Sequence, residues 1–410
     1  MKHPLTVACS SRKTAWKAVS LRSALTALLL VPLDALNAID LPSGLGADAN
    51  PTGQPIGGGL GYNAGPNSAQ AAFRVATLKA LQRALTMAKA GDLVWIEPDN
   101  EIDLAEAQLT VPEKVTLAGD RGFNGAPGPL LTVAMSKLDF RIQLKPGARL
   151  TGVRLRGPNP LMRDIDSERP SPSNYAIACM DAEVDNCEIS QFQRGGIALF
   201  RDSVRGHVHH NYLHDIAAYP VLVGKGSGDC HVIEANRIEW AWHALASNGS
   251  RGSGYTARYN VFVRVPRPKS FDGDGADSPN WCLDVHANTG EPTTPPRPGT
   301  RTLVVHHNTF LAAPDVRVGD GSELLKSINI YPKHDIFVGP GDGLTTTVNI
   351  HHNRFLMHEQ SGSQNKFKPY GRAIRLMGFK GEPAKLTDDP APEKDIWRVT
   401  IGDNVYGGHP

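Results

Sequence analysis

The stretch that decides the fold is VVHHNTF, from Val304 to Phe310, because two close relatives of it occur elsewhere in the chain. These relatives are HVHHNYL, from His207 to Leu213, and NIHHNRF, from Asn349 to Phe355. Weaker copies share the asparagine and an aliphatic or aromatic residue two places later. The asparagines that align are Asn186, Asn211, Asn236, Asn260, Asn308, Asn353 and Asn404.

The spacing of these asparagines indicates a solenoid. The first four lie 25, 25 and 24 residues apart, and the later gaps of 48, 45 and 51 fit one turn with an inserted loop or two turns. A fixed period in the twenties, built from short strand-like runs, is typical of repeats that stack on one another. An asparagine at a bend tolerates left-handed backbone angles, so stacked copies predict a ladder of side-chain amides about 4.8 Å apart.

A second strand-like run follows the asparagines by roughly 10–15 residues, as expected if each turn of a solenoid returns through another sheet. Two parallel strands per turn, both in register, predict an all-β fold, a single-domain right-handed parallel β-helix. The second runs are Gly196 to Phe200, Val221 to Gly224, His243 to Ser247, Cys282 to His286, Ser327 to Tyr331 and Ala373 to Met377.

The paired histidines of the repeat are interpreted mostly as architecture. Other copies of the unit carry Asp185, Glu234 or Arg258 at the corresponding position, so the position tolerates many polar residues. Stacked histidines are also able to capture a metal ion, but no carboxylate accompanies them at a fixed spacing. No metal site is therefore predicted here.

Composition and charge fit a globular β protein. The 410 residues suit two average domains or one large β domain, and the 41 glycines and 31 prolines indicate many turns. Residues 1–38 read as a signal peptide with a basic region and an apolar run from Ala24 to Leu33, which is too short to span a membrane. The alternative is a disordered basic tail.

Export predicts a secreted or periplasmic protein. Removal of residues 1–38 takes five positive charges and one negative charge, which changes the net charge from +2 to about −2. No basic field then favours nucleic acid, and no other segment is apolar enough to cross a membrane. The mature chain is expected to act as a monomer.

An amphipathic helix is predicted before the solenoid. Residues 69–90 carry apolar side chains at steps of three and four and end at Gly91. Such a helix would cover the open end of the coil, which would otherwise invite aggregation. The predicted organisation is a signal peptide at 1–38, an N-terminal extension at 39–68 and a β-helix domain at 69–406 with its capping helix at 69–90.

The chain resembles the pectate-lyase-like superfamily of right-handed parallel β-helices. The resemblance rests on GGGLGYN (Gly57 to Asn63), on the run from Thr77 to Leu104 and on VTLAGDRG (Val115 to Gly122), and the asparagine-centred coils extend it to about residue 404. It implies a carbohydrate-active protein, since the superfamily includes polysaccharide lyases, glycosidases and epimerases. The Asp-rich calcium strand and the arginine motif of true pectate lyases do not stand out, which leaves pectate in doubt as the substrate.

Strand alternation predicts a polar outer face. If Leu283 and Val285 point into the coil, Asp284 and His286 point outward about 7 Å apart. The expected catalytic residues are His243, Arg251, Tyr255, Asp284 and His286. The expected substrate-binding residues are Lys225, Asn329, Tyr331, Lys333 and Arg375.

The function expected from this face is β-elimination of an acidic, uronate-containing polysaccharide. The reaction needs a cation to neutralise the carboxylate, a base to remove the adjacent proton and an acid to protonate the leaving oxygen. The expected assignments are Arg251 or Arg375 as neutraliser, His286 or His243 as base, Tyr255 or Tyr331 as acid, and Asp284 as the partner of His286.

Other functions remain open at this stage. A glycoside hydrolase usually needs two facing carboxylates, and only Asp284 lies on the predicted face, with Asp277 or Glu291 available from loops. An epimerase on the same fold and a non-catalytic carbohydrate-binding solenoid are further alternatives. Structural interpretations also exist, with His243 as a packing residue beside Trp242 and Asp284 as a partner of a neighbouring coil.

No cofactor is required by this reading, although calcium is a possible ligand. Asp272, Asp274 and Asp277 lie in one inserted loop that lacks the terminal Glu of a twelve-residue calcium loop.

The cysteines provide a test of the predicted repeat. Cys179 and Cys230 lie two turns apart, about 9.6 Å at the strand spacing, so they are not expected to form a disulfide.

Overall fold

The computed structural model describes residues 44–134, 138–159, 175–199, 203–224, 226–239, 241, 243–248, 253–264, 282–285, 302–312, 336–338, 346–356, 374–376 and 397–407. The predicted signal peptide and the Asp-rich loop lie outside these residues. Among the helices described, none is long and apolar enough to cross a membrane.

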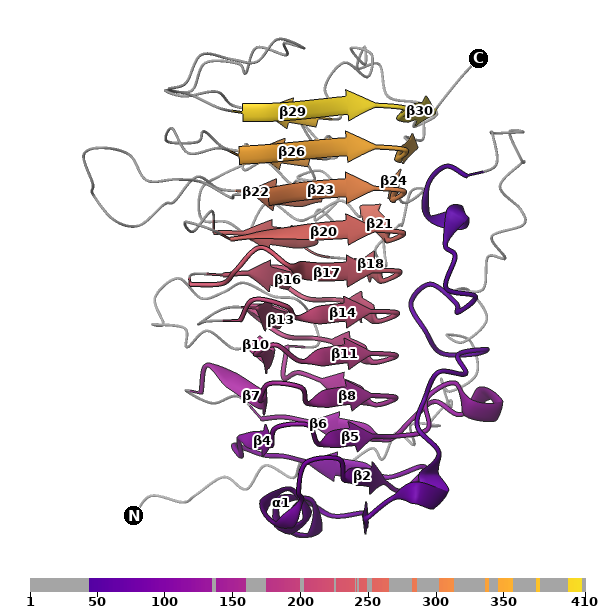
Figure 1. Cartoon of the computed structure of the whole chain (residues 1–410). Helices are drawn as coiled ribbons and strands as arrows, with labels where there is room; N and C mark the ends of the chain where they lie inside the picture. The colour runs from indigo at the N-terminus through magenta and orange to yellow at the C-terminus, as the bar shows by residue number, and fades with distance from the viewer. Residues whose placement is uncertain are drawn as a thin grey trace, which may run out of the picture. The chain divides into compact units, whose positions relative to one another are not determined.

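The described chain winds through three parallel sheets, A, B and C, in repeated order (Figure 1). Sheet A contains β1 (Phe73–Val75), β2 (Leu93–Ile96), β5 (Thr116–Ala118), β8 (Arg149–Thr151), β11 (Glu183–Asp185), β14 (His207–His209), β17 (His231–Glu234), β20 (Gly254–Arg258), β23 (Thr302–His306), β26 (Thr346–His351) and β29 (Trp397–Gly402).

Sheet B contains β3 (Glu101–Asp103), β6 (Leu130–Thr132), β9 (Arg154–Arg156), β12 (Glu188–Ser190), β15 (Tyr212–His214), β18 (Arg237–Glu239), β21 (Val261–Arg264), β24 (Thr309–Ala312), β27 (Arg354–Leu356) and β30 (Val405–Gly407). Sheet C contains β4 (Leu109–Val111), β7 (Phe140–Leu144), β10 (Tyr175–Cys179), β13 (Gly195–Leu199), β16 (Tyr219–Val223), β19 (Leu245–Ser247), β22 (Leu283–Val285), β25 (Ile336–Val338) and β28 (Ile374–Leu376).

This topology is a right-handed parallel β-helix, as predicted, because each strand pairs in parallel with the strand one turn away and such crossovers are right-handed in nearly all proteins. The expectation of two strands per turn is wrong. The asparagine-centred unit bends in its middle, where His210 has a φ of 52°, and thereby supplies both β14 to sheet A and β15 to sheet B.

The asparagine ladder is present at this bend. Asn236 donates from its side chain to the backbone oxygen of Val208 at 2.8 Å and to Oδ1 of Asn260 at 3.0 Å, and its backbone N–H donates to the same Oδ1 at 2.9 Å. This arrangement keeps the polar atoms of a buried amide bonded. It repeats along Asn211, Asn236, Asn260, Asn308, Asn353 and Asn404.

Asn186 is not a member of the ladder, contrary to the sequence alignment. Strand register places Asn186 opposite His210 and Cys187 opposite Asn211, one residue later than aligned. Asn186 instead takes the left-handed position of the bend, with a φ of 50°. The reason for the error is that asparagine suits both positions, and spacing alone does not separate them.

Apolar side chains from the three sheets fill the coil interior. Phe262, Phe310 and Phe355 of sheet B stack on successive turns with ring centroids 5.1 and 4.7 Å apart. Leu245, Leu283 and the other inward residues complete one continuous core. Contacts of this kind connect each turn mainly to its neighbours, as expected of a solenoid.

The helix α1 (Leu78–Met87) covers the N-terminal end of the coil and packs against β1, β2 and β4 (Figure 1). It buries Leu81, Ala84 and Leu85. The helix is shorter than the predicted residues 69–90, because Phe73–Val75 pairs with β2 as a strand and the Thr77 side chain caps the first turn. Short 3-10 turns form at Ala47–Ala49, Ser68–Gln70 and Phe123–Gly125.

Residues 44–64, the bracing segment, lie along the bends between sheets A and B (indigo in Figure 1). The segment bonds to several successive turns rather than to one, so it links coils that have no direct contact with each other. Its bonds include Gly46 N–H to His352 O, Ala47 N–H to Thr309 Oγ1, Gly57 N–H to Ala235 O, Gly59 N–H to Asn186 Oδ1 and Tyr62 O–H to Asp185 Oδ2.

Cys179 and Cys230 do not form a disulfide, as the repeat predicted. Cys179 is buried in the coil interior and Cys230 is exposed. Burial raises the pKa of the Cys179 thiol to about 12.

Candidate functional site

The predicted site lies on the outer face of sheet C, and the structure brings two of its residues together. Nε2 of His243 lies 3.5 Å from Oδ2 of Asp284, with side-chain exposures of 3% and 0%. Leu283 and Val285 face the core, so Asp284 points outward as predicted. His243 also stacks on Tyr219, with ring centroids 6.0 Å apart.

Strand register aligns Asp284 with Arg375, two strands further along sheet C. Asp284 pairs with Phe337, and Phe337 pairs with Arg375, so the backbone places all three at one register position. In the described part of sheet C, the strand between β22 and β28 is β25 (Ile336–Val338). The predicted run from Ser327 to Tyr331, with Asn329 and Tyr331, lies outside the described residues.

Tyr255 lies inside the coil and not on the predicted outer face. The side chain has no exposed surface and belongs to the core inside the coil. Burial, followed by the charge of Asp284, raises the pKa of its phenol well above the usual value. A proton donor for a polymer outside the coil therefore has to be another residue. Arg251, His286, Lys225, Asn329, Tyr331 and Lys333 lie outside the described residues.

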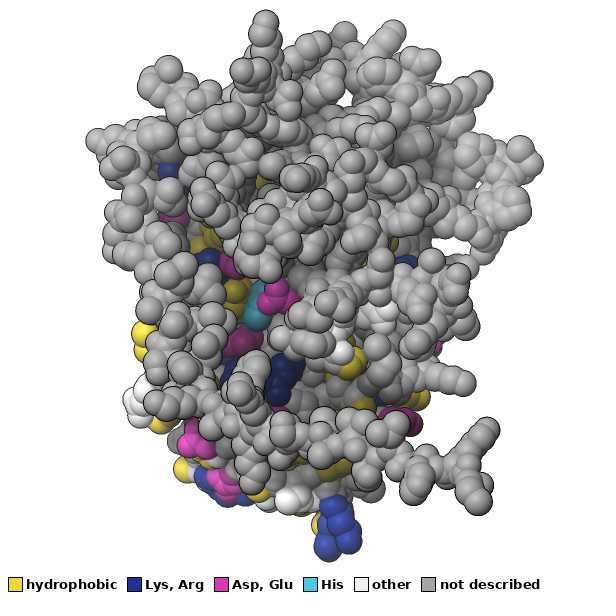
Figure 2. All heavy atoms as spheres, turned by 180° about the vertical axis from the view of Figure 1, so that it is seen from behind, with side chains coloured by type: hydrophobic (Ala, Val, Ile, Leu, Met, Phe, Trp, Pro, Cys, Tyr) yellow, Lys and Arg dark blue, Asp and Glu magenta, His cyan; other side chains and the backbone are white. Residues whose placement is uncertain are grey.

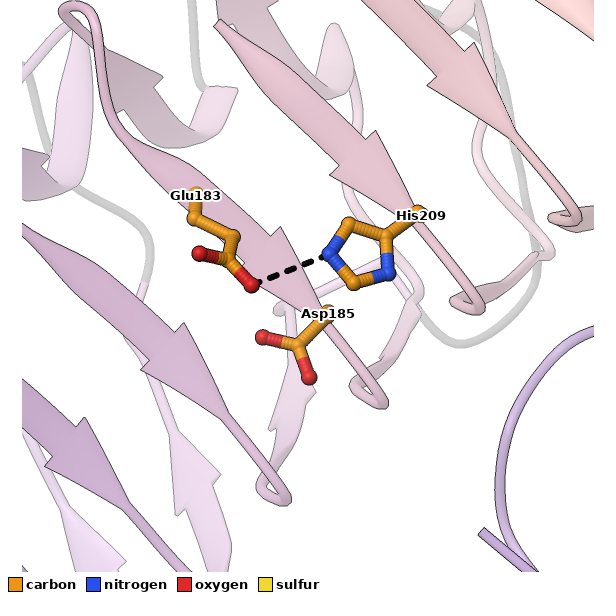
Figure 3. Close-up of side chains that lie close together, drawn as sticks. All are labelled: Glu183, Asp185 and His209. Atoms are coloured by element: carbon orange, nitrogen blue, oxygen red, sulfur yellow. Dashed lines mark hydrogen bonds and ion pairs between the residues drawn. The ribbon is translucent and has the colours of Figure 1, made fainter. Parts of the chain in front are cut away.

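A polar network occupies the outer face of sheet A. Glu183 and Asp185 stand two residues apart on β11, and Val184 between them points into the core. His209 on β14 is the register partner of Asp185. Its Nε2 lies 3.0 Å from Oε1 of Glu183, as Figure 3 shows. This hydrogen bond from His209 lowers the pKa of Glu183 against the opposing effect of burial.

The ligand atoms of these three side chains lie within 4.8 Å of one another, close enough to surround a metal ion. Asp185 already accepts two hydrogen bonds from Arg149, at 2.7 and 2.8 Å. It also accepts from the hydroxyls of Tyr62 at 2.7 Å and Thr151 at 2.8 Å. Arg149 supplies the positive charge that a metal would bring, so this cluster fits an ion-pair network and not a metal.

The network continues along the coil axis. Oε2 of Glu234 lies 3.4 Å from Nε2 of His207, and Nε of Arg258 lies 3.0 Å from Oε1 of Glu234. Burial alone would raise the pKa of Glu234, but the hydrogen bonds from His207 and Arg258 lower it to about 2. The charged side chains on this face thus satisfy one another, which favours a structural role.

The three histidine pairs share one geometry, with their Nδ1 atoms 2.8 Å apart. Because one ring donates and the other accepts, at least one ring of each pair is neutral. Burial and then the neighbouring histidine lower the pKa of His210 and of His306 to about 4. The pairs are His209–His210, His306–His307 and His351–His352.

A second group of acid, base and phenol side chains lies on the outer face of sheet B. Tyr212 and His214 stand two residues apart on β15, and Leu213 between them is in the core. Their rings stack with centroids 4.3 Å apart and planes 22° apart. From the side opposite to the view of Figure 1, a histidine side chain is visible with acidic and basic side chains near it (Figure 2).

His214 is held between two carboxylates. Its Nδ1 lies 2.6 Å from Oδ2 of Asp215, and its Nε2 lies 3.6 Å from Oε1 of Glu188. Burial alone would lower its pKa, but Asp215 and then Glu188 raise it to about 9. The ring is 17% exposed. His214 is therefore an imidazolium at neutral pH whose side chain is partly exposed but whose Nε2 atom is buried.

Tyr212 is bonded to the next strand. Its hydroxyl donates to Oε2 of Glu239 at 3.2 Å, and Nε of Arg237 pairs with Oε1 of the same carboxylate. The Arg237 guanidinium lies over the Tyr212 ring, 5.8 Å from the centroid, and its side chain is 42% exposed. Burial and then Glu239 raise the pKa of the Tyr212 phenol above its usual value.

This group, the Tyr212–His214 site, consists of Glu188, Tyr212, His214, Asp215, Arg237 and Glu239. It contains two partly exposed cations, a phenol and carboxylates, which are the groups that acid–base chemistry on a carbohydrate requires. The sequence signal was the run NYLHD, from Asn211 to Asp215, in which an aromatic residue and a histidine alternate with a leucine. It was missed because the residues after the asparagine were not recognised as a separate outward-facing strand.

No protein-family model matches the chain, and no curated protein is similar to it in sequence. Among solved structures it is similar to an alginate lyase from Paenibacillus sp. str. FPU-7, at 15% identity and a TM-score of 0.42, with 76% of this chain and 99% of that chain covered. It is also similar to the pectin methylesterase PemA from Erwinia chrysanthemi, at 9% identity and a TM-score of 0.35, with 78% and 88% covered. These likenesses concern the fold alone.

Proposed function

We propose that the protein is an exported polysaccharide lyase that cleaves a uronate-containing polysaccharide at the Tyr212–His214 site. The observation that carries this proposal is the stacked pair Tyr212 and His214, whose phenol and imidazolium face outward beside Arg237. The fold alone allows many chemistries, so the proposal rests on this constellation.

Arg237 and His214 supply positive charge. His214 is protonated at neutral pH because its pKa is about 9. A uronate carboxylate bound against the exposed guanidinium of Arg237 is partly neutralised, which stabilises the charge that develops at the adjacent carbon when its proton leaves. Asp215 and Glu188 hold the imidazolium in place.

Glu239 and Tyr212 carry the proton transfers. Glu239 removes the proton from the carbon next to the carboxylate, the bond from the following carbon to the glycosidic oxygen breaks, and Tyr212 protonates the departing oxygen. A carbon–carbon double bond forms in the product. The hydrogen bond between Tyr212 and Glu239 then returns the proton to the phenolate and restores both groups.

The outer face of sheet C is the alternative location. His243 and Asp284 lie 3.5 Å apart there, and Asp284 shares a register position with Arg375. The same reaction placed on this face would use His243 as the base and Arg375 as the neutralising cation, as the sequence suggested. The two locations differ in the residues on which activity depends.

The test is an ultraviolet absorbance assay for unsaturated uronate products with purified mature protein. The polymers are alginate, polygalacturonate, glucuronan and glycosaminoglycans, each with calcium and with chelator. Tyr212→Phe and His214→Gln remove groups from sheet B, and His243→Gln and Asp284→Asn are the matched variants on sheet C. Circular dichroism establishes that each variant is folded.

The proposal expects product from at least one polymer, with a loss of about a hundredfold or more in Tyr212→Phe and less than threefold in His243→Gln. The reverse pattern would move the site to sheet C. Release of reducing ends without absorbance would indicate a hydrolase, uronate inversion without cleavage an epimerase, and polymer binding without any reaction a carbohydrate-binding solenoid.

Export and partners form part of the same proposal. The predicted signal peptide supports action outside the cytoplasm, where acidic polysaccharides occur, and the chain is proposed to act as a monomer. Cell fractionation and size-exclusion chromatography of the mature protein test these two points.

A further inference from the structure

Gly57 of the bracing segment lies directly against Arg237. A Cβ atom placed on Gly57 would stand 3.0 Å from Cβ of Arg237 and 3.9 Å from its Cδ. The Gly57 N–H donates to the backbone oxygen of Ala235 at 2.9 Å, which fixes the segment two residues before Arg237. The φ of Gly57 is +85°, a conformation that favours glycine.

Gly57 is also connected to His214, through the side chains of Arg121 and Glu188. The buried Arg121 donates to the backbone oxygen of Gly57 at 3.2 and 3.3 Å and to Oδ1 of Asn186 at 3.1 Å. Its Nε lies 3.9 Å from Oε2 of Glu188, and Oε1 of Glu188 lies 3.6 Å from Nε2 of His214. Arg121 therefore stands between the bracing segment and the carboxylate that contacts the imidazolium.

We propose that Gly57 and Arg121 form a positioning device for the Tyr212–His214 site. The backbone at Gly57 sets the direction in which Arg237 leaves β18, and Arg121 sets the place of Glu188 beside His214. Docking of the bracing segment thus completes a site whose own residues lie some 130 residues or more further along the chain, as the bonds of Gly57 show. This inference rests on the proposed location of the site.

The first test compares Gly57→Ala with Gly61→Ala. Both glycines have positive φ, +85° and +89°, so both substitutions impose similar backbone strain. Nothing lies within 4 Å of a Cβ on Gly61, whereas a Cβ on Gly57 meets Arg237. The Arg237 side-chain NMR signal is expected to shift in Gly57→Ala only, with a fall in kcat of about tenfold and little change in KM.

The second test compares Arg121→Lys with Arg156→Lys. Lysine keeps the charge of Arg121 but loses the planar fork that bonds Gly57 and Asn186. Arg121→Lys is expected to lower the pKa of His214 by about half a unit or more, because Glu188 loses its fixed place beside the ring. NMR titration of His214 measures this change. Arg156 pairs with Glu101 on the same sheet, and Arg156→Lys is expected to leave the His214 titration unchanged.

These readouts separate failure of the inference from failure of the proposed function. The NMR signals of Arg237 and His214 are measured without any substrate. If they are the same in Gly57→Ala and Arg121→Lys as in the parent protein, the positioning device is refuted, whatever the protein cleaves. If they shift while no polymer is cleaved, the device stands and the lyase proposal fails.

Discussion

The backbone amide of Cys187 donates to Oδ1 of Asn211 at 3.0 Å, which makes Cys187 the first occupant of the asparagine ladder although it is not an asparagine. Its sulfur lies 3.7 Å from the backbone oxygen of Leu150, the acceptor that corresponds by register to the one used by Asn211. The Val153 amide also donates to this sulfur. The sulfur of Cys187, a weak hydrogen-bonding group, thus occupies the place that the side-chain amide of an asparagine takes on the later turns.

Cys187→Asn is therefore expected to stabilise the protein by about 1 kcal/mol, since its amide finds a donor and an acceptor already in place. The free energy of unfolding from urea titration measures this. Cys179→Asn is the control, because it puts an amide into the apolar coil interior, and it is expected to cost about 2 kcal/mol or more. Equal destabilisation by both variants would show that position 187 does not belong to the ladder.

Removal of a middle rung is expected to cost more than removal of the last one. Asn236→Ala would leave the backbone N–H of Asn211, one N–H of its side-chain amide and the oxygen of Val208 without the partner that Asn236 supplies. Buried groups of this kind cost about 1–3 kcal/mol each, so a loss of about 3 kcal/mol or more is expected. Asn404 lies at the half-buried C-terminal end of the ladder. Asn404→Ala is therefore expected to lower the free energy of unfolding by about half as much in the same urea titration.

The fold was predictable because the asparagine period reports a constraint that recurs at each turn. An amide bonds the bend between sheets A and B on six turns, so these six asparagines remain recognisable at irregular spacing. Asn186 misled the alignment because the left-handed position beside the ladder selects the same residue type. Three-residue strands such as Tyr212–His214 are too short for alternation to reveal a separate sheet.

The site was less predictable because it depends on contacts between turns. Asp284 was placed correctly on an outward position, since alternation within one strand decides that. Whether an outward residue is accessible depends on what covers it, and Asp284 proved to have no exposed surface. The association of Tyr212 with Glu239 and Arg237 requires the register between β15 and β18, which the sequence does not give.

Arg149 is expected to be the most costly arginine to replace on sheet A. Arg149→Met leaves the fully buried carboxylate of Asp185 without its cation, which typically costs about 3–5 kcal/mol. Asp185→Asn with Arg149→Met removes the unpaired charge and is expected to recover part of this loss. Chelator is expected to leave the melting temperature of the parent protein unchanged, because Arg149 already neutralises this cluster. A chelator-sensitive melting temperature that Asp185→Asn abolishes would contradict this account.

Stability is expected to decline on both sides of pH 6.5 for opposite reasons. The pKa of His231 is lowered to about 4, chiefly by burial, so the folded state binds fewer protons than the unfolded state below pH 6.5. That stabilisation is present above pH 6.5 and is lost as the pH falls toward 4. The pKa of His214 is raised to about 9, so its stabilisation is present below pH 6.5 and is lost as the pH rises through 9.

Urea titrations between pH 4 and pH 9 measure both limbs. His231→Asn is expected to make the acid limb shallower but not flat, because His210 and His306, whose pKa values are also lowered to about 4, still titrate there. His214→Gln is expected to flatten the alkaline limb and to leave the acid limb unchanged. The Glu234 carboxylate, with a pKa lowered from 4.5 to about 2, loses its stabilisation only as the pH falls below 4.5, so the histidine contribution is measured above about pH 5. An alkaline limb that persists in His214→Gln would mean that the imidazolium between Asp215 and Glu188 is not the group that titrates, and the positive charge proposed for uronate binding would then rest on Arg237 alone.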